Sequence, residues 1–222
     1  MDNSIKKGTG LSVHSIDYEQ KKISIDLSGM SEDDVCFRND ASIFFFAANS
    51  YKQAFYLLGK TIEERFEKEH KEKEIEHLIL PYYFNFRHYV ELELKGIITA
   101  VMEESPKMTH NLKELIEIAK EAISSIEPKQ DEFFYKEANK HKVKAQSLIE
   151  TIEIEMKPFF EQEPAADFYR YVFGVNNKNI VLNQPVIRLD YSKADSLFIG
   201  IVKHFNNLYI ELRETGTYVY QL

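Results

Sequence analysis

Four ionisable side chains follow one another at helical spacing in the aromatic segment 81–95. Arg87, Glu91 and Lys95 stand at positions i, i+4 and i+8, and His88 precedes Glu91 by three residues. On an α-helix, residues three and four positions apart lie on one face, so the four side chains are expected to form a single polar ladder. Cations beside an imidazole and a carboxylate can hold a phosphate group and transfer a proton, which makes this ladder the first candidate for chemistry.

Two interpretations of the ladder are open from the sequence. In the structural one, oppositely charged neighbours satisfy each other along the helix, and each exposed pair contributes only about 0.2–0.5 kcal/mol. In the functional one, Arg87 and Lys95 hold a phosphate while His88 or Glu91 moves a proton. The functional interpretation gives Arg87, His88 and Glu91 as catalytic candidates and Lys95 as a ligand-binding candidate.

A second group of candidates lies at the predicted start of the following helix. His110 and Asn111 come directly before the apolar run that begins at Leu112, and either Thr109 or Asn111 can cap that helix. Backbone N–H groups at a helix start favour anions, so His110 and Asn111 join the ligand-binding candidates. The alternative is that His110 simply caps the helix or packs against the loop.

Other reactive side chains lack a pattern that indicates a site. His141 falls on the apolar face of a predicted helix, which favours a core histidine. Arg65 and His70 have four residues between them, but they lie in a run of charges where this spacing arises from composition alone. Cys36 has no cysteine partner for an internal disulfide, and the chain has neither an H-E-x-x-H zinc signature nor a glycine-rich phosphate loop. The sequence therefore predicts neither a metal ion nor a cofactor.

Composition limits the classes of function. A chain of 222 residues with 44% apolar residues can bury a substantial core and is most simply one domain. The formal net charge of −8 opposes broad attraction to nucleic acid, so any RNA binding must be focused on a local basic site. The N-terminal lysines are not followed by an apolar stretch, and no segment reaches about 18 uninterrupted apolar residues, which predicts a cytoplasmic protein that does not span a membrane.

Apolar periodicity predicts a mainly α fold with small β additions. Alternating side chains at 11–27 predict a β-hairpin, and two short apolar runs within 180–189 predict a β-ribbon. Proline favours the first helical turn, so one helix is predicted to begin at Pro81. Apolar residues at three- and four-residue steps predict a bundle of four to five helices, which lie within residues 40–66, 81–105, 112–126, 134–158 and 192–215. The domains would then be a hairpin appendage at 1–30 and a helical domain at 31–222.

Two segments together resemble bacterial HEPN-like proteins. In that family a helix with the pattern R-H-x-x-E-L-x-L-K is followed by a helix start of the G-H-D-L type. Here these are Phe86–Lys95 and Thr109–Leu115, with Thr109 and Asn111 in place of the usual glycine and aspartate. The resemblance covers roughly residues 40–160. It implies a helical bundle, often dimeric, that cleaves RNA, binds a nucleotide or acts in phage defence or toxin systems.

Three functions follow from these residues and this resemblance. The leading one is a HEPN-like protein that forms a homodimer and binds a nucleotide, RNA or a partner protein. The second is a metal-independent endoribonuclease, in which Arg87 and Lys95 stabilise the developing phosphorane charge while His88, assisted by Glu91, acts as acid or base. Nuclease members of the family use an arginine and a histidine separated by four to six residues, a spacing absent from segment 86–95. The third is an interaction module whose aromatic surface docks another protein.

Overall fold

The computed structural model describes residues 12–17, 22–26, 39–68, 72–102, 109–127, 132–162 and 191–215 of the chain. The chain divides into two compact units, Met1–Asn39 and Asp40–Leu222, and each unit is described by itself. All side chains of the candidate site belong to the second unit.

Among its described residues, the first unit contains two β-strands, β1 (Ser12–Asp17) and β2 (Lys22–Asp26). The strands pair in antiparallel orientation, and a register shift interrupts the ladder between Val13 and Ser15. The connection between them lies outside the described residues.

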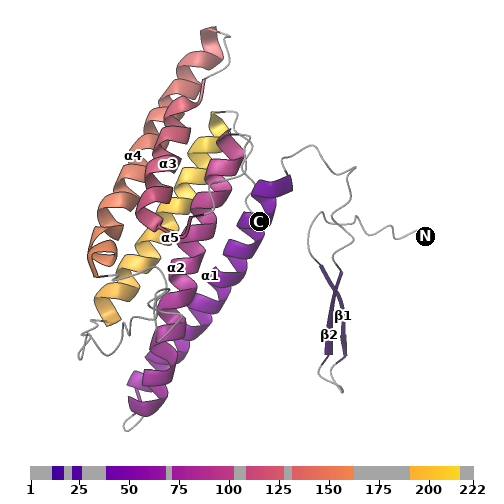
Figure 1. Cartoon of the computed structure of the whole chain (residues 1–222), viewed down its shortest axis with the longest axis vertical. Helices are drawn as coiled ribbons and strands as arrows, with labels where there is room; N and C mark the ends of the chain where they lie inside the picture. The colour runs from indigo at the N-terminus through magenta and orange to yellow at the C-terminus, as the bar shows by residue number, and fades with distance from the viewer. Residues whose placement is uncertain are drawn as a thin grey trace. The chain divides into compact units, whose positions relative to one another are not determined.

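The described residues of the second unit form a bundle of five helices (Figure 1). Their bounds are α1 Asn39–Phe66, α2 Glu72–Met102, α3 Leu112–Ser125, α4 Glu132–Gln162 and α5 Tyr191–Glu214. Helix α3 packs between α2 and α4, and α4 packs against α5. Helix α1 contacts α2 and α5 through aromatic side chains. None of the described helices combines the length and the apolar character needed to cross a membrane.

The predicted fold class is wrong in its β component. Among the described residues of Asp40–Leu222, all regular secondary structure is helical, so the bundle itself is all α. The hairpin predicted at 11–27 is not an element of this bundle, because β1 and β2 belong to the other unit. The ribbon predicted at 180–189 lies outside the described residues. Alternating apolar residues are a local signal for extended backbone, and they do not specify the layer on which a strand packs.

Helix α2 begins at Glu72 rather than at Pro81, which lies inside the helix. A proline in a helix interior cannot donate its backbone hydrogen bond and costs an isolated helix about 3 kcal/mol. Tertiary packing compensates here, since Ile75, Leu78 and Ile79 lie partly buried against the core. These contacts override the local preference of proline for the first helical turn.

Aromatic rings join α1, α2 and α5 in the core. Phe86 of α2 stacks on Phe198 of α5 with ring centroids 3.6 Å apart, and Phe55 of α1 packs against both rings. Further along α2, the Phe45 ring of α1 lies so close to Gly96 that an added Cβ atom would stand 2.5 Å from it. Glycine therefore permits a close approach of α1 to α2, and this packing fixes the helix that carries the polar ladder.

Candidate functional site

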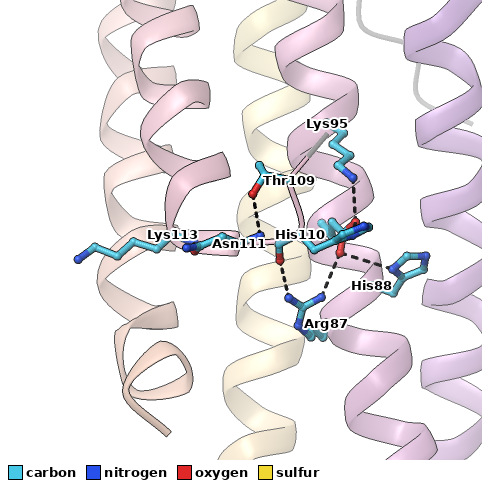
Figure 2. Close-up of polar contacts among 8 residues, drawn as sticks. Arg87, His88, Lys95, Thr109, His110, Asn111 and Lys113 are labelled. Carbon is cyan, nitrogen blue, oxygen red and sulfur yellow. Dashed lines mark hydrogen bonds and ion pairs between the residues drawn. The ribbon is translucent and has the colours of Figure 1, made fainter. Parts of the chain in front are cut away.

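Glu91 is the centre of a buried ion-pair network on α2. Figure 2 labels its partners Arg87, His88, Lys95 and His110. The Glu91 Oε2 atom accepts a hydrogen bond from Arg87 Nη1 at 3.0 Å, and its Oε1 atom accepts one from Lys95 Nζ at 2.9 Å. Glu91, Arg87 and Lys95 are only 1%, 3% and 7% exposed. The three side chains share one face of the helix, which is the arrangement that their spacing predicts.

His110 reaches this network from the segment before α3. Its Nδ1 atom lies 2.8 Å from Glu91 Oε1, and its backbone carbonyl accepts a hydrogen bond from Arg87 Nη2 at 2.5 Å. The side chain of His110 is nevertheless 56% exposed. The network therefore ties α2 to the start of α3 and presents an oriented imidazole to solvent.

His88 approaches the other oxygen of the same carboxylate. Its Nδ1 atom lies 3.7 Å from Glu91 Oε2, which is beyond hydrogen-bond distance but within range of charge interaction. The imidazole packs edge-on against Tyr51 of α1, with centroids 4.4 Å apart, and stacks on Phe84 at 5.6 Å. Its side chain is 16% exposed, so aromatic rings cover most of His88.

Glu91 remains a carboxylate at neutral pH. Burial alone would raise its pKa, but contacts with His88, Lys95 and His110 outweigh burial and hold the pKa of Glu91 well below its ordinary value. The two cations Arg87 and Lys95 face one carboxylate, so this trio carries one net positive charge before either histidine is protonated. A local positive charge can attract an anion even though the whole chain carries −8.

Asn111 caps α3, and it is one of the two residues, Thr109 and Asn111, that the sequence offered for this cap. Its Oδ1 atom accepts hydrogen bonds from the backbone N–H groups of Lys113 at 3.1 Å and Glu114 at 3.3 Å. Thr109 Oγ1 accepts a hydrogen bond from the Asn111 N–H at 3.2 Å (Figure 2). The same hydroxyl donates a hydrogen bond to Glu114 Oε2 at 2.9 Å. The side-chain oxygen of Asn111 is therefore engaged in fixing the helix start that carries His110.

Solvent reaches the candidate residues unequally. Arg87, Glu91 and Lys95 are buried and paired, whereas His110 is more than half exposed and His88 much less. To stabilise a phosphorane, Arg87 and Lys95 would have to reach the ligand from 3% and 7% exposure while both remain paired with Glu91. The geometry thus favours the structural interpretation for the buried trio and leaves His110 as the member that a ligand reaches most easily.

Sequence reasoning missed several polar contacts of the bundle. His141, predicted to be a core histidine, lies half-buried with its Nδ1 atom 2.6 Å from Glu211 of α5. His204 of α5 lies 3.2 Å from Glu155 of α4. These partners are 70 and 49 positions apart in the chain, so no local spacing could reveal them. Glu93 is a further buried carboxyl group, on a different face of α2 from the ladder.

Fold and site together define an all-α bundle in which a buried ion-pair network orients a histidine. Within the part of the chain that the structure describes, no group of three or more His, Cys, Asp or Glu side chains could hold a metal ion. Cys36 and His70 lie outside that part. Comparison of the chain with protein-family models, curated proteins and solved structures finds no match. The HEPN-like resemblance therefore stays a prediction from the sequence.

Proposed function

We propose that this protein is a HEPN-like binding protein that takes a phosphate group of RNA or of a nucleotide at the exposed edge of the Glu91 network. The observation that supports the proposal most is the environment of His110. Glu91 holds its ring, Arg87 holds its backbone carbonyl, and the side chain remains 56% exposed. The resemblance in Phe86–Lys95 and Thr109–Leu115 supplies the class of ligand.

Phosphate binding at this edge rests on orientation and charge. The contact between His110 Nδ1 and Glu91 directs the Nε2 atom away from the carboxylate. In its protonated state the ring can donate Nε2–H to a phosphate oxygen while Nδ1–H stays on Glu91. Ring and backbone are already fixed, so binding loses little side-chain entropy. The positive trio of Arg87, Glu91 and Lys95 adds a favourable local potential.

Binding without cleavage agrees best with the burial of the other candidates. Cleavage of RNA requires an acid and a base that both reach the substrate, together with a positive group beside the phosphorane. His88 is covered by Tyr51 and Phe84, and Arg87 and Lys95 are held by Glu91. The endoribonuclease is therefore the alternative function, and cleavage of RNA by wild type would favour it.

Fluorescence anisotropy tests the proposal with two probes, a fluorescein-labelled single-stranded RNA and a fluorescent ATP analogue, both in chelator. Wild type should bind at least one probe. His110→Ala should weaken that binding about 10- to 100-fold, because a hydrogen bond to a charged group contributes about 1.5–3 kcal/mol. His141→Ala is the matched control, since it also removes an imidazole in contact with a glutamate, but on α4. This control should leave the affinity unchanged.

Two results would contradict the proposal: wild type binds neither probe, or both histidine variants lose affinity equally. A denaturing gel of the same RNA tests the alternative function. Cleavage by wild type that disappears in His88→Ala would favour the endoribonuclease.

A further inference from the structure

A second buried carboxyl group, Glu93, lies on a different face of α2 from the Glu91 network. Two residues correspond to about 200° of rotation around a helix, so Glu93 faces away from Glu91. Glu93 is 4% exposed, and its Oε2 atom has no hydrogen-bond partner among the described residues. One turn earlier, the buried hydroxyl of Tyr89 forms no hydrogen bond of good geometry within the described part of the chain, although it lies close enough to the Glu93 carboxyl group to influence it as a weak donor. Buried polar atoms usually form hydrogen bonds, so Glu93 Oε2 and the Tyr89 hydroxyl are unusual.

Helix α1 supplies the charged neighbour of this pair. Lys52 attracts the Glu93 carboxyl group electrostatically, although the described contacts include no ion pair between them. Tyr56 of α1 helps to raise the pKa of Tyr89 electrostatically, after the larger effect of burial. On the α5 side, the apolar Phe205 ring packs edge-on against Tyr89, with ring centroids 5.8 Å apart. Glu93 therefore lies where α1 faces α2, with one partly exposed cation nearby and no hydrogen bond to its Oε2 atom.

These surroundings favour the neutral form of the acid. Burial raises the pKa of Glu93 to about 8, and the opposing influences of Lys52 and Tyr89 offset burial only in part. Glu93 thus keeps its proton at neutral pH, whereas Glu91, two residues earlier, has lost its own. Helix α2 therefore carries two buried glutamates, of which Glu91 is negatively charged and Glu93 is neutral.

We propose that Glu93 is a proton-operated latch between α1 and α2: the neutral side chain packs between the helices, and loss of its proton opens their contact. A carboxylate in this position must be hydrated or paired, because an isolated buried charge is costly. The cation that acts on it, Lys52, belongs to the other helix, so hydration or pairing of the carboxylate changes the contact between α1 and α2. The latch does not depend on the proposed phosphate site, since it uses another face of α2.

The direction in which pH changes the unfolding equilibrium follows from the pKa of Glu93 in the folded and in the unfolded chain. The unfolded chain loses this proton near the ordinary glutamate value of 4.5, whereas the folded chain keeps it up to about 8. Between these pH values unfolding releases a proton, so the equilibrium constant for unfolding rises up to about tenfold per pH unit. Above that range both states are deprotonated, and the effect levels off.

Urea unfolding of wild type and Glu93→Gln at about pH 5.5, 6.5 and 7.5 measures this proton release. Glutamine has no proton to lose. The ratio of the unfolding constants, wild type to variant, should therefore rise about 100-fold over these two pH units. Glu137→Gln is the matched control, because Glu137 is an exposed glutamate that pairs with Lys140 on the surface of α4. This control should follow wild type at every pH.

Hydrogen exchange locates the opening. As the pH rises, amides of α1 around Lys52 and of α2 around Glu93 should lose protection in wild type, after correction for intrinsic rates, and keep it in Glu93→Gln. If Glu93→Gln does not fold, Lys52→Met is compared with wild type instead. Removal of the cation raises the pKa of Glu93, so the loss of amide protection should shift to higher pH. A constant ratio of unfolding constants, or an unshifted exchange profile in Lys52→Met, would overturn the latch.

Discussion

Replacing Glu91 by glutamine removes the negative charge on which Arg87, Lys95 and His110 converge. The three donor atoms lie 3.0, 2.9 and 2.8 Å from the carboxylate oxygens. Arg87 and Lys95, at 3% and 7% exposure, would keep their charges without a buried counter-ion. Removing one partner of a buried ion pair costs about 3–5 kcal/mol. We expect Glu91→Gln to lower the free energy of unfolding by that amount.

Urea unfolding followed by circular dichroism at neutral pH measures this loss. Glu153→Gln is the matched control, because it also removes a carboxylate that pairs with a lysine, here Lys120 of α3 at 2.8 Å, but its side chain is 31% exposed. Exposed pairs contribute about 0–1 kcal/mol, so the control should lose far less stability. Equal losses in the two variants would refute the reasoning that burial makes the Glu91 pairs essential.

The same carboxylate should make the bundle sensitive to acid. The pKa of Glu91 in the folded chain lies below the ordinary value of 4.5. Its stabilisation is therefore present above that pH and is lost as the pH falls toward the folded pKa. Wild type should lose stability below about pH 4.5 more steeply than Glu91→Gln, and parallel curves for the two proteins would contradict the assigned charge state.

Two further substitutions test the packing of α2 and the cap of α3. Gly96→Ala places a Cβ atom 2.5 Å from the Phe45 ring and should cost about 1–3 kcal/mol of unfolding free energy, whereas Gly200→Ala, whose nearest new contact is 3.9 Å, should be neutral or stabilising. Equal changes in unfolding free energy for Gly96→Ala and Gly200→Ala would show that the Phe45 ring can move aside at no cost. Asn111→Ala removes the acceptor of two backbone N–H groups and should cost about 1 kcal/mol. It should also weaken RNA binding, and an unchanged anisotropy titration would show that the cap does not position His110.

The sequence predicted the features that depend on local geometry. The order of Arg87, Glu91 and Lys95 places them on one helix face wherever that helix packs, so their mutual contacts could be anticipated. The cap at Asn111 is equally local, because its side chain reaches backbone groups only two and three residues ahead. Apolar periodicity gave the helices for the same reason, since the helical period fixes which side chains can share a buried face.

The features that the sequence did not predict depend on partners far along the chain. Pro81 lies inside α2 because the turn before it is packed against the core, and no local rule for proline contains that contact. The pairing of His141 with Glu211 crosses from α4 to α5. The charge state of Glu93 depends on burial beside α1, whereas its position in the sequence only places it off the ladder.

The affinity of the double variant Glu91→Gln/His110→Ala for single-stranded RNA tests most directly whether Glu91 acts on the ligand through His110. Each single variant, once shown by circular dichroism to be folded, should bind more weakly than wild type. The double variant should bind no more weakly than His110→Ala alone, because removing the imidazole already removes what Glu91 orients. A loss equal to the product of the two single effects would contradict the assignment of His110 as the residue that the network serves.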